Sequence, residues 1–309
     1  MNSTTMARPA PAPRVPMPAL LIAALALLPF IADATGHAFW LAPASRMLVF
    51  ALAALGLNLI LGHGAMVSMG HALYIGIGAY AVGILAAHGV TSALVQPAAA
   101  LAAGAVVATL TGLVCLRASG VAFIMITLAF AQMFHYLATG LKAYGGDEGL
   151  PIELPGLDPA VLYWVILALV AASLLGMHRL VNSRFGMLLR GCRSNERRMK
   201  ALGFPTLRYR LAAYVISALA CVVAGMLLAH VTRFASPSYV HWTVSGDLIA
   251  MIVLGGTGRL IGPVIGAAGW VLLQELLAAS PWPPLAEHWP LLFGLGIVVM
   301  VLRRKGEPA

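Results

Sequence analysis

Residues 181–210 read VNSRFGMLLRGCRSNERRMKALGFPTLRYR, a basic stretch between two long apolar runs. It contains seven arginines and one lysine but a single acidic residue, Glu196. A short turn is enough to join two membrane-spanning helices, so a loop of this length is more than a connector. This stretch, called here the basic loop, predicts a docking surface on a chain that is otherwise almost entirely apolar.

The composition of the whole chain assigns it to the membrane. Hydrophobic residues make up 61% of the 309 residues and charged residues only 9%, and the mean hydropathy is +0.92. Too little polar surface is present to cover a soluble globule of this size. The net charge of +9 does not indicate nucleic-acid binding, because most Lys and Arg residues adjoin the ends of apolar runs.

Apolar runs of roughly 20 residues, the length that crosses a bilayer, predict an all-α polytopic integral membrane protein with about ten transmembrane or partly spanning helices. The expected spans are 17–33, 43–62, 66–87, 93–115, 120–141, 160–179, 211–232, 245–257, 259–279 and 289–302. The eighth is too short for an ordinary span. One transmembrane domain, 17–303, is therefore expected between cytoplasmic tails at 1–16 and 304–309, with the basic loop as its largest inner segment.

Charge placement supports this topology. With a cytoplasmic amino terminus and ten crossings, only Arg46, Lys142 and Arg233 of the 19 Lys and Arg residues lie outside, as the positive-inside tendency requires. Most acidic residues, including Asp247 and Glu275, are expected outside or near the outer helix ends. An alternative interpretation of residues 1–34 is a cleaved secretory signal, which leaves the other orientations unchanged.

Ionisable groups are expected to be absent from the middle of the spans. Proton- or sodium-coupled carriers need such groups inside their helices, whereas His135, His230 and Glu275 are expected near helix ends. Intrinsic ion coupling is therefore disfavoured, and energy for uphill transport is expected to come from another source.

The basic loop has the pattern of an amphipathic helix. Phe185, Leu188, Leu189, Cys192, Met199 and Leu202 recur at helical spacing on one side, with Arg190, Arg193 and Arg197 on another. Gly203 and Pro205 are expected to end the helix, Asn182 or Ser183 to cap it, and Gly191 to divide it. From these residues alone, a topology signal, a lipid-bound helix and a protein-docking helix all remain open.

Four ordered blocks resemble the LivM-type permeases of ABC importers for branched-chain amino acids. They are Arg184 to Gly203 in the basic loop, GAMVSMGHALYIGIGAY at 64–80, FIMITLAFAQMFHYLATGLKAYGGDEG at 123–149 and LIAMIVLGGTGRLIGPVIGA at 248–267. The resemblance implies that the basic loop carries the coupling helix that seats on an ATPase subunit. The residues implied in coupling are Arg184, Phe185, Gly186, Leu189, Arg190, Arg193, Asn195, Glu196, Arg197 and Gly203.

The resemblance also implies the partners: a second permease subunit, two cytoplasmic ATPases that hold ATP and Mg, and a periplasmic binding protein. The bacterial inner membrane is the implied location and an amino acid the implied cargo. Urea, short amides or sugars are the alternative cargo, and an ion-coupled secondary carrier is a further alternative. The chain contains no Gly-Lys-Ser/Thr sequence, so ATP must bind elsewhere, and no catalytic, cofactor or metal residue is predicted in this chain. His63 and His71 are expected to bond backbone where a helix is irregular.

Polar residues within apolar spans are candidates for the translocation pathway. They are Asn58, Ser68, Thr127 and Gln132, and the alternative for each is a hydrogen bond to a neighbouring helix. The acidic pair Asp147 and Glu148 lies in an outer loop, where it is expected either to contact a binding protein or to be simply solvated.

Overall fold

The computed structural model describes residues 25–27, 29, 41–153, 158–278, 291, 294–296 and 298. The expected tails at 1–16 and 304–309, and the alternative of a signal cleaved near residue 34, lie outside these residues. The expected first and tenth spans fall almost wholly outside them as well.

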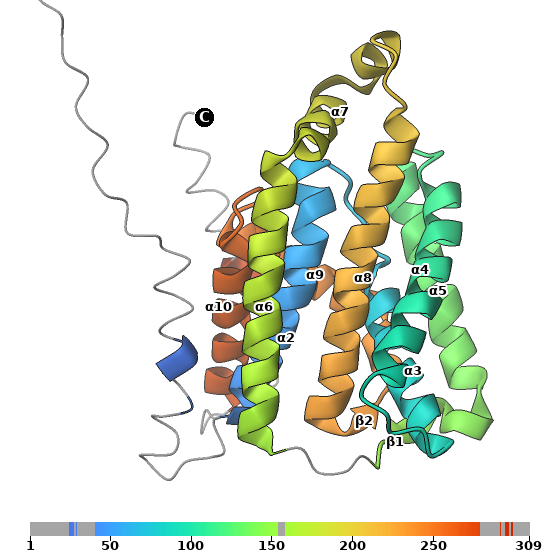
Figure 1. Cartoon of the computed structure of the whole chain (residues 1–309), viewed down its shortest axis with the longest axis vertical. Helices are drawn as coiled ribbons and strands as arrows, with labels where there is room; N and C mark the ends of the chain where they lie inside the picture. Colours follow the sequence, from blue (N-terminus) through green and yellow to red (C-terminus); the bar gives the residue numbers. More distant parts are fainter. Residues whose placement is uncertain are drawn as a thin grey trace, which may run out of the picture.

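The described chain is a bundle of apolar helices (Figure 1). The long helices are α2 (Leu41–Asn58), α3 (His71–Ala87), α4 (Val95–Cys115), α5 (Val121–Gly140), α6 (Pro159–Asn182), α7 (Arg184–Ala201), α8 (Thr206–Thr232), α9 (Trp242–Gly255) and α10 (Gly262–Ala278). Short elements are a π-helical turn η2 (Leu59–His63), three 3-10 turns η3 (Lys142–Tyr144), η4 (Gly146–Glu148) and η5 (Pro237–Val240), and two strands β1 (Leu150–Pro151) and β2 (Phe234–Ala235). The fold is an all-α polytopic membrane protein.

Apolar helices match the second to ninth expected spans. Within the described residues, five helical segments have the length and composition to cross a membrane, namely 41–63, α4, α5, α6 and α8, while α3, α9 and α10 are shorter. The expected eighth span is indeed short, as α9. An unexpected feature is a short antiparallel pair of strands, β1 and β2, in which Leu150 pairs with Ala235. It lies at the end of the bundle away from α7 (Figure 1).

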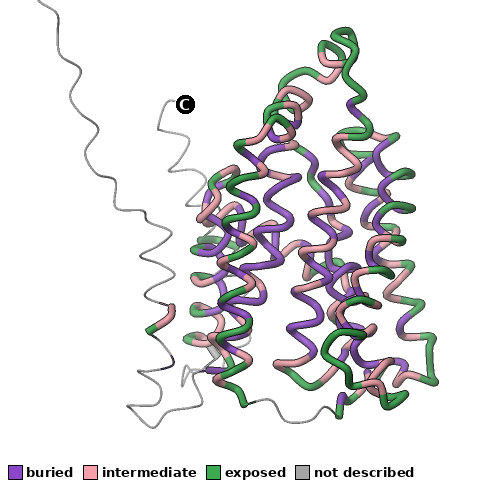
Figure 2. Tube along the Cα trace, in the orientation of Figure 1, coloured by how far each residue is buried: buried purple, intermediate pink, exposed green. Residues whose placement is uncertain are grey.

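Helix α8 lies at the centre of the bundle, against α2, α3 and α4. Figure 2 shows buried residues along α2 and α8 and exposed residues along the outer helices. Gly78 of α3 contacts the carbonyl of Val222, and Gly225 of α8 contacts the carbonyl of Ile75. Each contact leaves no room for a β-carbon, so the small residues allow these two backbones to pack closely.

The third expected span, 66–87, is wrong at its start, because α3 begins only at His71. Residues 64–70 form an extended link that descends beside α8 from the end of η2 to α3 (Figure 1). The Ser68 hydroxyl accepts from the amide of Gly70 at 3.3 Å, and Ala65 has a positive φ of 51°. Side-chain bonding to nearby backbone competes with the helical pattern here.

Candidate coupling surface and translocation pathway

Helix α7 consists of two helical segments joined at Asn195, which has extended backbone angles (φ −161°, ψ 96°). The Asn195 Oδ1 accepts from the amide of Arg198 at 3.0 Å, so Asn195 caps the second segment. The break was expected at Gly191. Instead Gly191 faces Met199, whose Sδ would lie 2.9 Å from an added β-carbon, so this glycine lets the second segment fold back on the first.

Both ends of α7 are defined by its flanking residues. Ser183 occupies the N-cap position, but its hydroxyl donates to the Leu180 carbonyl at 2.6 Å rather than capping α7. At the other end Gly203 has a φ of 84°. Its amide donates to Lys200 O at 3.0 Å, and the Phe204 amide donates to Met199 O at 3.2 Å. This is a Schellman motif, which confirms the expected end at Gly203.

The first segment of α7 is fastened to the helix bundle. Leu189 is completely buried, and Gly186 contacts the Val181 carbonyl. Arg190 Nη1 donates to the same Val181 carbonyl at 2.9 Å, and Arg193 Nη1 donates to the carbonyl of Gly62. Two of the three arginines expected on one face thus bind backbone of this chain.

Glu196 fastens the second segment to α8. Its carboxylate pairs with Lys200 at 2.9 Å and with Arg210 at 2.8 Å, and it also accepts from the Thr206 hydroxyl at 3.4 Å. Burial raises the pKa of Glu196, but the two cations outweigh burial and hold this pKa below its ordinary value. The lone acid of the basic loop therefore ties α7 to the first turns of α8.

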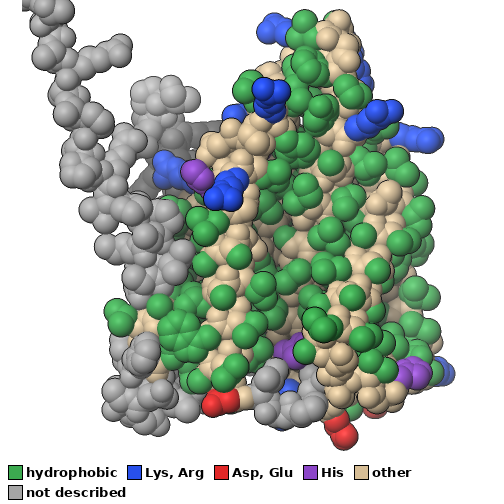
Figure 3. Space-filling model, viewed as in Figure 1, with side chains coloured by type: hydrophobic (Ala, Val, Ile, Leu, Met, Phe, Trp, Pro, Cys, Tyr) green, Lys and Arg blue, Asp and Glu red, His purple; other side chains and the backbone are tan. Residues whose placement is uncertain are grey.

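The end of the molecule formed by residues 197–208, called here the tip, is both basic and apolar (Figure 3). Arg197, Arg198, Lys200 and Arg208 are exposed there. Leu202, Phe204 and Leu207 are 65%, 39% and 44% exposed. Exposed apolar side chains rimmed by charge are typical of a protein docking site.

The apolar face expected on the basic loop is mostly used within the chain. Leu189 is buried, and Leu188, Cys192 and Met199 are half-buried. Phe185 lies against Tyr209 with ring centroids 6.0 Å apart. From that face only Leu202 is exposed, and Phe204 and Leu207 complete the exposed set. These two were missed because they follow Gly203, outside the helical period.

Asn58 joins the end of α2 to the loop between α9 and α10. It is 1% exposed, its Nδ2 donates to Arg259 O at 3.0 Å, and its Oδ1 accepts from Gly258 N at 3.2 Å. It therefore holds the loop between α9 and α10 against the end of α2. A role in the pathway remains a prediction. In this structure the Asn58 side chain forms hydrogen bonds with backbone groups of Gly258 and Arg259.

Ser68 and Thr127 are buried and hold the link 64–70 in place. Ser68 Oγ lies 2.9 Å from Nδ1 of His71, and His71 Nε2 lies 2.9 Å from Ser217 Oγ. Thr127 Oγ1 accepts from Met69 N at 3.1 Å. His71 thus bonds two serine hydroxyls rather than backbone, contrary to expectation. His63 does lie by backbone, with Nδ1 3.4 Å from Asn58 O in the π-helical turn.

One side of the link 64–70 is open. Met66 and Ser68 are buried, whereas Ala65 and Val67 are exposed. No described residue donates a hydrogen bond to the carbonyls of residues 64–69. Non-helical backbone at membrane depth is tolerated where it is covered by protein or lines an aqueous cavity, but not against lipid. Inside a membrane, the open side of this link would need to be covered by protein or water.

Gln132 differs from the other three pathway candidates. The structure does not bring it to the link, and its Oε1 is buried with no hydrogen-bond partner among the described residues. It lies in α5 between Thr127 and His135. Of the four candidates, Gln132 therefore has an acceptor that is free to form a hydrogen bond with a ligand.

Asp147 and Glu148 are exposed in η4 at the end of the bundle opposite the tip. Asp147 lines a polar cavity of about 340 Å³ together with His135, Thr139, Ser236, Pro237, Ser238, His241 and Thr243. The ring centroids of His135 and His241 are 5.1 Å apart. Among the described residues no three His, Cys, Asp or Glu side chains are grouped to hold a metal.

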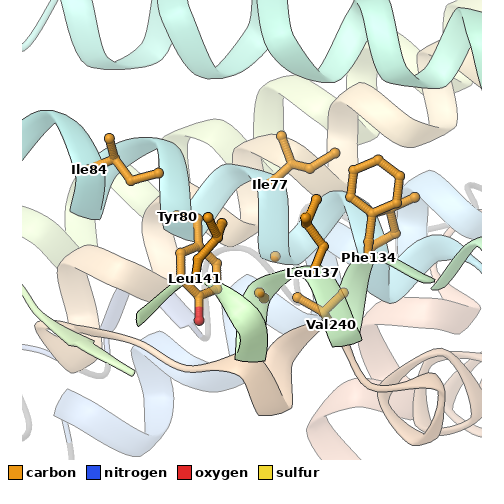
Figure 4. A pocket seen from close by; sticks show the side chains of 10 residues that line it. Ile77, Tyr80, Ile84, Phe134, Leu137, Leu141 and Val240 are labelled. Atoms are coloured by element: carbon orange, nitrogen blue, oxygen red, sulfur yellow. The ribbon is translucent and has the colours of Figure 1, made fainter. Parts of the chain in front are cut away.

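A second cavity on this side is apolar (Figure 4). It has a volume of about 100 Å³ and lies between α3, α5 and η5, lined by residues that include Ile77, Phe134 and Val240. The Tyr80 hydroxyl is buried with no partner among the described residues. This cavity offers an ionic ligand no charged partner.

Asp247 was expected outside the membrane or near the outer end of a helix. It lies in the second turn of α9 and is half-buried. Ser245, two residues earlier, accepts from the Ala72 amide at 2.8 Å, which places this turn level with the start of α3 inside the bundle. The signal for this position in the sequence is the four-residue spacing between Thr243 and Asp247, which places both on one face of a helix.

The chain was compared with known proteins. The family model described as the permease component of the branched-chain amino acid transport system matches residues 41–302. The chain is 27% identical to the high-affinity branched-chain amino acid permease LivM of Escherichia coli K12, and equally to that of Salmonella typhimurium, over 85% of this chain and 68% of the relative. It is also 27% identical to the ribose import permease RbsC of Escherichia coli K12, over 80% of this chain and 81% of the relative.

No solved structure matches the chain. The family match spans every described helix from α2 to α10, including the tip and the link 64–70. The chain is therefore a transport subunit that belongs to the family of branched-chain amino acid transport system permease components.

Proposed function

We propose that this protein is the membrane subunit of an ABC importer in the bacterial inner membrane, and that its cargo is a branched-chain or other hydrophobic amino acid. It pairs with a second permease and two cytoplasmic ATPases, and it receives cargo from a periplasmic binding protein. The observation that carries this proposal is the tip. Its exposed apolar and basic side chains belong to a helix that is attached to the bundle by hydrogen bonds and an ion pair.

The contacts of α7 support a mechanical role. A surface that only set topology or bound lipid would need no fixed attachment to the interior. Arg193, however, bonds the carbonyl of Gly62, and Glu196 bonds Arg210 of α8. Motion of a partner bound at the tip is thereby transmitted to the end of α2 and to the link 64–70.

The exposed side of that link supports a pathway at the surface facing the second permease. Its carbonyls at residues 64–69 accept no backbone hydrogen bond from the described residues, and backbone of this kind inside a membrane must be covered by protein or water. The outer acids Asp147 and Glu148 lie on the opposite side from the tip, where a binding protein approaches.

The test is uptake by the purified complex in proteoliposomes with its binding protein. L-leucine, L-isoleucine or L-valine should be accumulated with ATP, and loaded binding protein should stimulate ATP hydrolysis. Stimulation by ribose or urea, with none by these amino acids, would support the alternative cargo, which the similarity to a ribose permease favours. Uptake that persists without ATP and collapses with an ion gradient would support a secondary carrier.

A further inference from the structure

The carboxylate of Asp247 has no hydrogen bond or ion pair with any residue that the structure describes. It is half-buried in α9, level with the start of α3. A charged group at membrane depth is costly, and where it persists it usually serves a substrate, an ion or a proton. The unpaired carboxylate of Asp247 is therefore available to bind a cation, and it does not serve the packing of the helices.

A row of polar side chains leads from the outer surface to this depth. On α9, Thr243 and Asp247 are four residues apart and share a face. On α5, Thr139, His135 and Gln132 are spaced by four and three residues and also share a face. Thr243, His135 and Thr139 line the polar cavity beside Asp147, and α5 contacts α9.

The deeper groups of this row are hydrogen-bond acceptors. His135 Nδ1 lies 3.1 Å from the carbonyl of Pro237. Because a carbonyl only accepts, Nδ1 carries a proton here, and in the tautomer that bears a single proton Nε2 is an acceptor. The buried Oε1 of Gln132 has no partner among the described residues, and the Asp247 carboxylate only accepts. Such a set is complementary to a cation that carries several N–H donors.

We propose that Asp247 binds the α-ammonium group of the amino acid as it passes between α5 and α9, with Gln132 and His135 as further acceptors along the way. This inference rests on the proposed function and deepens it. Urea, short amides and ribose carry no ammonium group, so the site selects amino acids over these neutral solutes.

The test compares Asp247→Asn with wild type in the reconstituted complex, using L-leucine and the unaltered binding protein. The amide is isosteric with the carboxylate, so assembly and thermal stability should be retained. Leucine uptake should fall by about tenfold or more, because the change replaces a charge-assisted hydrogen bond to the ammonium group with a neutral one. ATP hydrolysis stimulated by loaded binding protein should stay within about twofold of wild type, because neither the tip nor the outer loop is altered.

Asp247→Glu keeps the charge and should restore a large part of the uptake. The matched control is Glu275→Gln, a half-buried carboxylate on α10 that lies in an apolar cavity away from the polar row, and it should transport like wild type. Full leucine uptake by Asp247→Asn overturns the inference and leaves the proposed function intact. Equal loss of uptake and of thermal stability in Asp247→Asn also overturns it, because that pattern indicates a packing role.

Two further outcomes are distinguishable. If wild-type uptake at constant ATP depends on an imposed proton or sodium gradient and Asp247→Asn abolishes that dependence, Asp247 binds an inorganic cation and the inference is wrong. If wild type accumulates ribose or urea but no amino acid, the proposed function fails first, and the assignment of an ammonium ligand fails with it.

Discussion

Arg193 of α7 donates a hydrogen bond to the main-chain carbonyl of Gly62, in the π-helical turn that follows α2. Gly62 itself has no room for a side chain, since a β-carbon would lie 2.5 Å from Asn58 Oδ1 and 2.6 Å from Gly258 N. One residue thus joins α7, the end of α2 and the loop before α10. Single π-helical turns often occur at functional sites, and this one lies between the tip and the link 64–70.

Replacing Arg193 with alanine should uncouple the transporter without unfolding it. The change removes a hydrogen bond from a charged donor, which is typically worth about 1.5–3 kcal/mol. Leucine uptake should fall by about tenfold, and ATP hydrolysis should lose its response to loaded binding protein. The control is Arg179→Ala, an exposed arginine at the end of α6, which should behave like wild type. Normal uptake by Arg193→Ala would remove Gly62 from the coupling route.

Replacing Asn58 with alanine should destabilise the fold as well as transport. It leaves the Gly258 amide and the Arg259 carbonyl without their partner, at a cost of about 1–3 kcal/mol for each buried group. The midpoint of thermal unfolding in detergent should drop measurably. Thr109→Ala on the exposed side of α4 is the control and should leave the midpoint unchanged. An unchanged midpoint in Asn58→Ala would show that these contacts are dispensable.

Reporter fusions test the orientation of the chain. A phosphatase that is active only outside the cytoplasm should be inactive when fused after Lys200 and active after Glu148, because the basic tip and the acidic η4 turn lie at opposite ends of the bundle. Fusions that report the same side would overturn the ten-span topology.

The fold could be predicted from apolar run length and charge placement wherever a segment is a plain helix. Helices α4, α5, α6 and α8 lie close to their expected ranges because nothing in them competes with helical hydrogen bonding. The link 64–70 could not be predicted from hydropathy, since GAMVSMG is apolar enough for a span. Its course depends on Thr127 and Ser217, which come from distant parts of the sequence.

The candidate site could be predicted only in outline. The basic residues of α7 were recognised by type, but which of them bond backbone of this chain depends on Val181 and Gly62, which periodicity does not reveal. The level of Asp247 in the bundle depends on the contact of α9 with Ala72, which the local sequence does not reveal. Tertiary contacts, rather than local pattern, decide which polar residues face a pathway.

Replacing Glu196 with alanine should loosen the second segment of α7 and impair transport, because Lys200 and Arg210 lose their shared partner. The pKa of Glu196 is held below its ordinary value, so its contribution is complete above about pH 4.3, the ordinary value for Glu, and is lost as pH falls through the lowered value. A nitroxide label on Leu202→Cys should become more mobile in wild type only at such acidic pH. In Glu196→Ala it should be mobile at neutral pH also, and an immobile label there would contradict the role of the ion pairs.

Gly203 is the sharpest test of the coupling assignment. Its φ of 84° suits glycine, while a β-carbon would meet no atom within 4 Å, so any effect of substitution arises from backbone conformation rather than from a clash. Gly203→Val should cost about 1–2 kcal/mol locally and unwind the end of α7, which displaces Leu202 and Phe204 from their places on the tip. Gly203→Asn tolerates this conformation better and is the matched control.

Both proteins should insert normally, because residue 203 lies outside the spans. Uptake and stimulated ATP hydrolysis should be lost in the valine variant and largely kept in the asparagine variant. Full ATP-dependent uptake by Gly203→Val at matched expression would reduce the basic loop to a topology signal.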